Sequence, residues 1–163
     1  CMELLNNAVN GGHKVLLFSQ FTSMLGILEK RMEEAGIGYY SLTGSTPKKE
    51  RMELMEKFNR DATPVFCISL KAGGTGLNLT GADVVIHYDP WWNVAAENQA
   101  TDRAHRMGQQ ASVHVYKLIA KDTIEEKILE LQEKKSALME TVTGGDGESL
   151  LSMSREELLS LLN

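Results

Sequence analysis

The chain has 163 residues, a mass of 18.1 kDa and a formal net charge of −5. This length suits one domain with a single core, and 42% apolar with 24% charged residues exclude a disordered chain or a disulfide scaffold. No apolar run approaches the roughly 20 residues that a membrane span needs, so no membrane partner is expected. The chain opens at Cys1 without an initiator methionine, from which we expect a fragment of a longer protein.

Charge is divided unevenly along the chain. Residues 1–121 carry 13 basic and 12 acidic side chains, and residues 122–163 carry 4 basic and 10 acidic ones. The net charge excludes a strongly basic nucleic-acid module, but the balanced first part can still hold a local positive face. Cys67 lies in the apolar run VFCIS, which predicts a buried strand thiol and a reducing, intracellular location.

The first half of the chain alternates between predicted helices and strands. Residues 2–10 form a short helix, and KVLLF (14–18) is an apolar run typical of a strand covered on both faces. Residues 22–35 have a helical period, and IGYYSL (37–42) is a second strand. Thr46 is expected to cap the next helix, with Pro47 in its first turn. The buried stripe of that helix is predicted to be Met52, Met55 and Phe58.

The second half continues the alternation. VFCISL (65–70), DVVIHY (83–88) and VHVYKLIA (113–120) are further strands, and Asn93 begins a helix that reaches about Met107. Thr123–Glu126 is a capping box that opens a long helix, and LLSLL follows a second capping box. Strands separated by helices predict an α/β fold with a mostly parallel sheet.

Four loops that follow strands carry unusual chemistry: Ser19–Thr22, Thr43–Thr46, Lys71–Gly81 and Asp89–Asn93. A parallel sheet would bring all four to one edge, where hydroxyls, backbone amides and helix N-termini suit a phosphate chain. Two plainer interpretations stay open. Ser19 and Gln20 can be ordinary loop residues, and the glycines can form a tight turn, since neither GxGxxG nor GxxxxGK[ST] is present.

The segment ENQATDRAHRMGQ (97–109) gives the sharpest local signal. On a helix, Gln99, Arg103 and Arg106 share one face, and two arginines with a glutamine suit recognition of a phosphoryl group. The alternative is a solvated face on which Asp102 and Arg106 form an i, i+4 pair.

Four segments together resemble the second RecA-like lobe of Swi/Snf-type ATPases, the DNA-translocating members of helicase superfamily two. The segments are KVLLFSQFTSML (14–25), SLTGSTPKKERMELMEKFN (41–59), ISLKAGGTGLNLTGADVVIHYDPWWN (68–93) and ENQATDRAHRMGQ (97–109). The resemblance implies a RecA-like three-layer α/β sandwich over residues 1–121, without a phosphate loop of its own. Residues 122–163 would be a helical extension that packs on this lobe or on the missing first lobe.

The resemblance also implies roles for particular residues. Arg103 and Arg106 match arginine fingers that reach ATP across the cleft, with Gln99 beside them, and Gly74 and Gly76 match the nucleotide-linked glycine motif. The positions that match contacts to duplex DNA are Ser19, Gln20, Thr46, Lys71, Thr75, Trp92 and Asn93. The family usually has Asp at position 43 and Pro at position 94, where this chain has Thr43 and Val94.

The implied cofactor is ATP with Mg²⁺, held mainly by the N-terminal RecA-like lobe of the same protein. The implied partners are that lobe, double-stranded DNA and DNA-bound proteins, in the cytoplasm of a prokaryote or the nucleus of a eukaryote. Because the chain has no phosphate loop and no DExH-like acids, we expect it to be inactive alone. A non-catalytic DNA-binding module and the matching lobe of an RNA helicase are the alternatives, and the DRAHRMGQ string disfavours the latter.

Overall fold

A computed structural model describes residues 1–69, 78–90 and 112–143. Its five strands form one sheet in the order β2-β3-β1-β4-β5, and every adjacent pair is parallel. The predictions made for residues 70–77, 91–111 and 144–163 lie outside the described residues. Within the described residues, the α/β fold with a parallel sheet is confirmed.

The register aligns the carboxyl ends of the strands. The strands are β1 (Val15–Ser19), β2 (Tyr39–Leu42), β3 (Val65–Ser69), β4 (Val84–His87) and β5 (His114–Lys117). Ser19 lies opposite Ser69, and Phe18 lies opposite His87 on the other side of β1. The loops that leave these strands therefore start from one edge of the sheet, as the sequence predicts.

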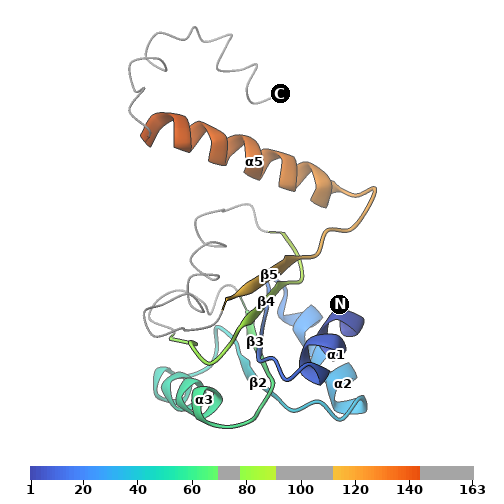
Figure 1. Cartoon of the computed structure of the whole chain (residues 1–163), viewed down its shortest axis with the longest axis vertical. Coiled ribbons are helices and arrows are strands. Elements are labelled where there is room, and N and C mark those ends of the chain that lie inside the picture. The colour runs from blue at the N-terminus through green and yellow to red at the C-terminus, as the bar shows by residue number, and fades with distance from the viewer. Residues whose placement is uncertain (70–77, 91–111, 144–163) are drawn as a thin grey trace, which may run out of the picture.

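Helices cover both faces of the sheet (Figure 1). The helices α1 (Met2–Asn10) and α2 (Thr22–Glu34) lie on one side, where Leu5, Leu25 and Met32 pack against Val15 and Leu17. The helix α3 (Lys48–Arg60) lies on the other side, where Phe58 packs with Leu16 and Phe18. Successive residues of β1 point to opposite faces, so its five residues are all buried, as expected for a strand covered on both sides.

The last described elements are more exposed. All four residues of β5, at one end of the sheet order, are exposed, whereas those of β2 at the other end are half-buried or buried. After a turn at Asp122, which has a φ of 59°, the chain enters α5 (Ile124–Thr143). Glu126 accepts the backbone N–H of Asp122, and Thr123 Oγ1 accepts that of Glu125, so the helix begins where the capping box predicts. The described residues contain no helix long and apolar enough to cross a membrane.

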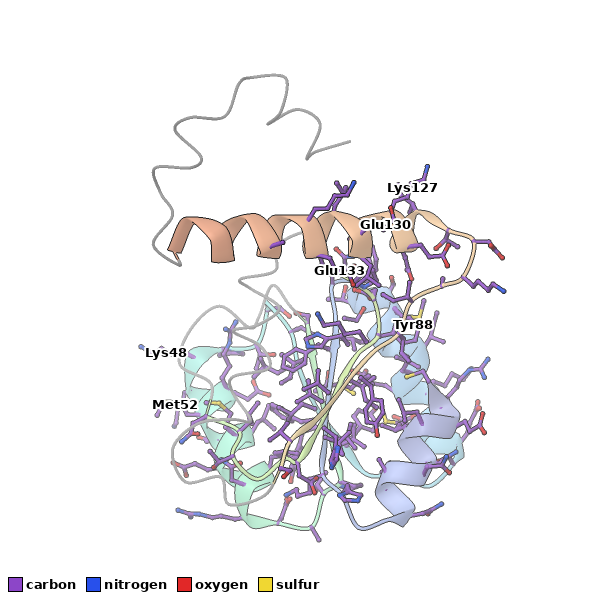
Figure 2. The ribbon with its side chains drawn as sticks, turned by 45° about the horizontal axis from the view of Figure 1, so that its top comes forward. Lys48, Met52, Tyr88, Lys127, Glu130 and Glu133 are labelled. Carbon is purple, nitrogen blue, oxygen red and sulfur yellow. The ribbon has the colours of Figure 1, made fainter. Side chains whose placement is uncertain are left out.

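Two local predictions on α3 are wrong. Met52 is 55% exposed and points away from the sheet, whereas Phe58 is fully buried (Figure 2). Pro47, with a ψ of 148°, rather than Thr46, is the residue that precedes α3, and no side chain caps the helix. The hydroxyl of Thr46 is instead used within its own loop, where it accepts the backbone N–H of Thr43 at 3.1 Å.

Tyr39, on the edge strand β2, supports a prediction about alkaline pH. Its hydroxyl donates to Glu33 of α2 at 2.7 Å, and this hydrogen bond, with burial, raises the pKa of Tyr39 from 10.0 to about 12. Because the folded pKa is above the unfolded one, this stabilisation is complete below pH 10.0 and is lost as the pH rises to about 12. The free energy of unfolding, measured with urea, should therefore fall more steeply between these pH values in the wild type than in Tyr39→Phe. Equal slopes would contradict the assignment, and Tyr116→Phe on β5 is the matched control.

Candidate functional site

Asp89 ties together two loops at the carboxyl edge of the sheet. It follows β4 and is 4% exposed. One of its carboxylate oxygens accepts a hydrogen bond from the hydroxyl of the buried Ser19 at the end of β1. The other oxygen accepts the backbone N–H of Gln20 at 3.0 Å. Because β1 and β4 are neighbours, one buried carboxylate fixes the chain as it leaves both strands.

The environment of Asp89 shifts its protonation. Burial raises the pKa of this carboxyl above its usual 3.8, while the hydrogen bonds from Ser19 and Gln20 act in the opposite direction. The net direction is upward, so desolvation has the larger effect. The hydrogen bonds from Ser19 and Gln20 therefore offset part of the cost of burying this carboxylate.

Gln20 extends the link toward the next segment. Its side-chain amide donates to the backbone carbonyl of Pro90 at 3.2 Å, and the residue is half-buried. Pro90 is the last described residue before the Trp91-Trp92 pair. Gln20 thus donates two hydrogen bonds to the end of the described segment, from its backbone to Asp89 and from its side chain to Pro90.

Arg51 organises the second loop, residues 43–46. Its guanidinium donates to the carbonyl oxygens of Thr46 at 2.7 Å and Gly44 at 3.0 Å. The backbone N–H of Thr46 also donates to the carbonyl of Thr43 at 3.1 Å. A cation in the first turn of a helix opposes the helix dipole, so the carbonyl set explains why arginine is accommodated here.

Two exposed lysines follow this loop. Lys48 and Lys49 begin α3 and are exposed, and Figure 2 shows Lys48 at the surface of the molecule. Arg51 takes up loop carbonyls, and the two lysines add positive charge beside the loop, next to the exposed Glu50 in the same turn. We call Thr43–Thr46 with Lys48 and Lys49 the α3 entry surface.

The predicted site residues divide into two groups. Ser19, Gln20 and Thr46 are described: Ser19 ends β1 and is fully buried, and Gln20 and Thr46 lie in loops that leave the same edge of the sheet. The others lie outside the described residues: Lys71, Gly74, Thr75, Gly76, Trp92, Asn93, Gln99, Arg103 and Arg106. Within the described ranges, no three His, Cys, Asp or Glu side chains come together to hold a metal, so we assign no metal ligand to them.

Sequence reasoning misses the residues that hold the loops. It does not predict Asp89 or Arg51 as site residues, although each has a signal. An aspartate directly after a buried strand needs hydrogen-bond donors, and an arginine in the first turn of a helix needs acceptors. Neither signal names the partner, because Ser19 and Asp89 are 70 positions apart in the chain.

A parallel sheet with helices on both faces and polar loops at its carboxyl edge is consistent with a RecA-like lobe. The chain belongs to the family of the helicase conserved C-terminal domain, whose model matches residues 1–108, and its relatives place it with the Swi/Snf-type ATP-dependent helicases. A solved structure of the C-terminal part of the Fun30 ATPase domain matches this chain with a TM-score of 0.77 and 44% sequence identity. The matched region is 80% of this chain and 43% of the Fun30 chain.

Curated relatives come from bacteria and eukaryotes. An ATP-dependent helicase of Mycoplasma pneumoniae is 45% identical over 161 residues, which is 98% of this chain and 16% of the relative. The putative ATP-dependent helicase/translocase YwqA of Bacillus subtilis is 44% identical over 98% of this chain and 18% of its own length. The human chromatin-remodeling ATPase INO80 is 43% identical over 98% of this chain and 10% of its own length. The chain therefore spans less than a fifth of these relatives.

Proposed function

We propose that this chain is the second ATPase lobe of an ATP-dependent translocase that moves along double-stranded DNA. The observation that carries the proposal is that the loops after β1, β2 and β4 leave one edge of a parallel sheet. This is where open α/β sheets bind their ligands. Membership of the helicase family supports ATP as the ligand on this edge.

On the nucleotide side, we propose that Arg103 and Arg106 are arginine fingers for ATP bound by the first lobe. Two guanidinium groups would stabilise the charge that develops on the phosphoryl group, with Gln99 beside them. Gly74 and Gly76 would let the backbone approach the nucleotide. ATP, bound with Mg²⁺, would supply the phosphoryl group that is transferred. We propose that both are held mainly by the first lobe. This chain alone would therefore be inactive.

On the DNA side, we propose that the contacts are to phosphates and are independent of sequence. Gln20, Thr46 and the lysines of the α3 entry surface are the described candidates, and Lys71, Thr75, Trp92 and Asn93 complete the set. Ser19 has no exposed surface, and its hydroxyl donates to Asp89. We therefore propose that Ser19 positions the Gln20 loop, and that any DNA contact there is made by the neighbouring backbone.

We further propose that residues 1–121 are the lobe and residues 122–163 an extension. The end of β5 at Lys117 and the start of α5 at Ile124 support this division. Ile128 and Gln132 of α5 are buried, whereas Ile124 is 65% exposed. We propose that the extension packs on this lobe or on the first one, and that the protein works inside the cell.

A charge-loss experiment tests the DNA side. The double substitution Lys48→Ala with Lys49→Ala in the full-length protein should weaken duplex binding on any sequence. The slope of log K against log salt should fall by about 0.9 for each phosphate that the protein no longer neutralises. The matched control is Lys57→Ala with Arg60→Ala, which removes the same charge from exposed residues at the other end of α3. An equal loss of duplex affinity in both double variants would contradict the proposal that DNA binds at the carboxyl edge of the sheet.

A further inference from the structure

Asn59, near the end of α3, connects this helix to the end of the glycine-rich run. Its side-chain amide donates to the backbone carbonyl of Asn78 at 2.9 Å. The carbonyl oxygen of the same amide accepts the backbone N–H of Gly81 at 3.0 Å. A single amide thus uses its donor and its acceptor on two backbone groups, across sequence separations of 19 and 22.

Apolar side chains anchor the segment 78–82 in the hydrophobic core. Leu79 and Ala82 are fully buried in the cluster that contains Phe58, the residue before Asn59. The backbone N–H of Ala82 donates to the carbonyl of Leu79 at 3.2 Å, so the segment is a compact turn. We call Asn78–Ala82 the return turn. It is fixed against α3 by core packing on one side and by Asn59 on the other.

The return turn and α3 approach each other closely at Gly81, where glycine leaves the most room. A Cβ at Gly81 would lie 3.0 Å from Asn59 Oδ1 and 3.1 Å from Asn59 Cα. The second atom is backbone and cannot rotate away, so a Cβ at this position fits only if the return turn and the helix move apart by a few tenths of an ångström. Gly81 has no positive φ, so close approach, and not the backbone conformation, is what favours glycine here.

We propose that Asn59 is a positioning residue that holds the downstream end of the glycine-rich run Lys71–Gly81 for its work on nucleotide and DNA. This inference rests on the proposed function of Gly74, Thr75 and Gly76. Asn59 itself is exposed, so its two neutral hydrogen bonds contribute little to overall stability. Its replacement should therefore affect the activity more than the fold.

Four variants of the full-length protein test the proposal. Asn59→Ala removes both hydrogen bonds, and Asn59→Asp keeps an acceptor for Gly81 but loses the donor to Asn78. Gly81→Ala displaces the same turn from the opposite side. Glu56→Gln, which changes another exposed residue of α3, is the matched control.

We expect DNA-stimulated ATP turnover to fall about tenfold in Asn59→Ala and Gly81→Ala, as small displacements of positioned groups do. Asn59→Asp should fall between Asn59→Ala and wild type. A fifth variant that combines Asn59→Ala with Gly81→Ala should be no less active than the more impaired of the two single variants, because both changes disturb the same contact between α3 and the return turn. Amide exchange of peptides covering 70–82 should become faster while that of the strands is unchanged, a pattern that a loss of global stability would not give.

The outcomes separate the two proposals. If duplex DNA does not stimulate the wild type, the proposed function fails and this inference fails with it. If the wild type is stimulated but Asn59→Ala matches Glu56→Gln in turnover and in exchange, the inference alone is overturned. A general loss of protection across all strands, in proportion to the loss of turnover, would also overturn it by showing a purely structural role.

Discussion

Replacing Arg106 with alanine in the full-length protein is expected to lower DNA-stimulated ATP turnover by about a thousandfold, the effect of removing an arginine finger. The physical reason is that a guanidinium stabilises charge on the phosphoryl group only as the transition state forms. The Michaelis constant for ATP should therefore change much less than the turnover number. Steady-state hydrolysis with saturating duplex DNA measures both.

The matched control for this prediction is Arg60→Ala, which removes an exposed arginine at the end of α3. Its turnover should stay close to that of the wild type. Arg103→Ala should resemble Arg106→Ala, because we propose that both residues face the same phosphate. Near-normal turnover in Arg106→Ala, with an unchanged thermal unfolding profile, would refute the finger assignment.

Asp89→Ala is expected to have the largest effect on folding stability among the site variants. It removes the acceptor of the half-buried Gln20 N–H and leaves the Ser19 hydroxyl only the longer contact to the Phe21 carbonyl at 3.4 Å. An unsatisfied buried donor costs about 1–3 kcal/mol. Urea unfolding of the chain measures this destabilisation. Asp89→Asn is the matched variant, because its amide oxygen can still accept one of the two donors, so its destabilisation should be smaller. A wild-type midpoint for Asp89→Ala would contradict the role of this carboxylate.

The raised pKa of Asp89 also gives a dependence on pH. The folded carboxyl binds its proton more tightly than the unfolded one, whose usual pKa is 3.8. The stability from this group is therefore fully present below pH 3.8 and declines as the pH rises through the folded pKa. This part of the pH profile should be absent from Asp89→Asn.

Much of the fold can be predicted because short apolar runs indicate strand burial. The run KVLLF predicts a strand covered on both faces, and β1 is buried throughout. The sequence predicts the last strand over 113–120, but β5 spans only His114–Lys117, and it is exposed. β5 lies at one end of the sheet order, and no local pattern gives that order or the difference in burial from β2 at the other end.

The contacts that hold the site cannot be predicted in the same way. The sequence predicts Thr46 as the cap of α3, yet its hydroxyl bonds within the loop while Arg51 holds the carbonyls. Asn59 looks like an ordinary polar residue near a helix end, and only the fold brings it to Gly81. Local sequence predicts which residues prefer loops and caps, but long-range partners depend on how the strands pair.

The proposed ATP site is best tested by finding which residues lie beside the γ-phosphate in the assembled protein. A non-hydrolysable ATP analogue with a photoreactive group on that phosphate would be bound to the full-length protein with duplex DNA and then irradiated. We predict labelling of the segment 97–109, competed away by ATP and retained in the Arg60→Ala control. Labelling confined to other parts of the protein would contradict the proposal that this lobe completes an ATP site held by another.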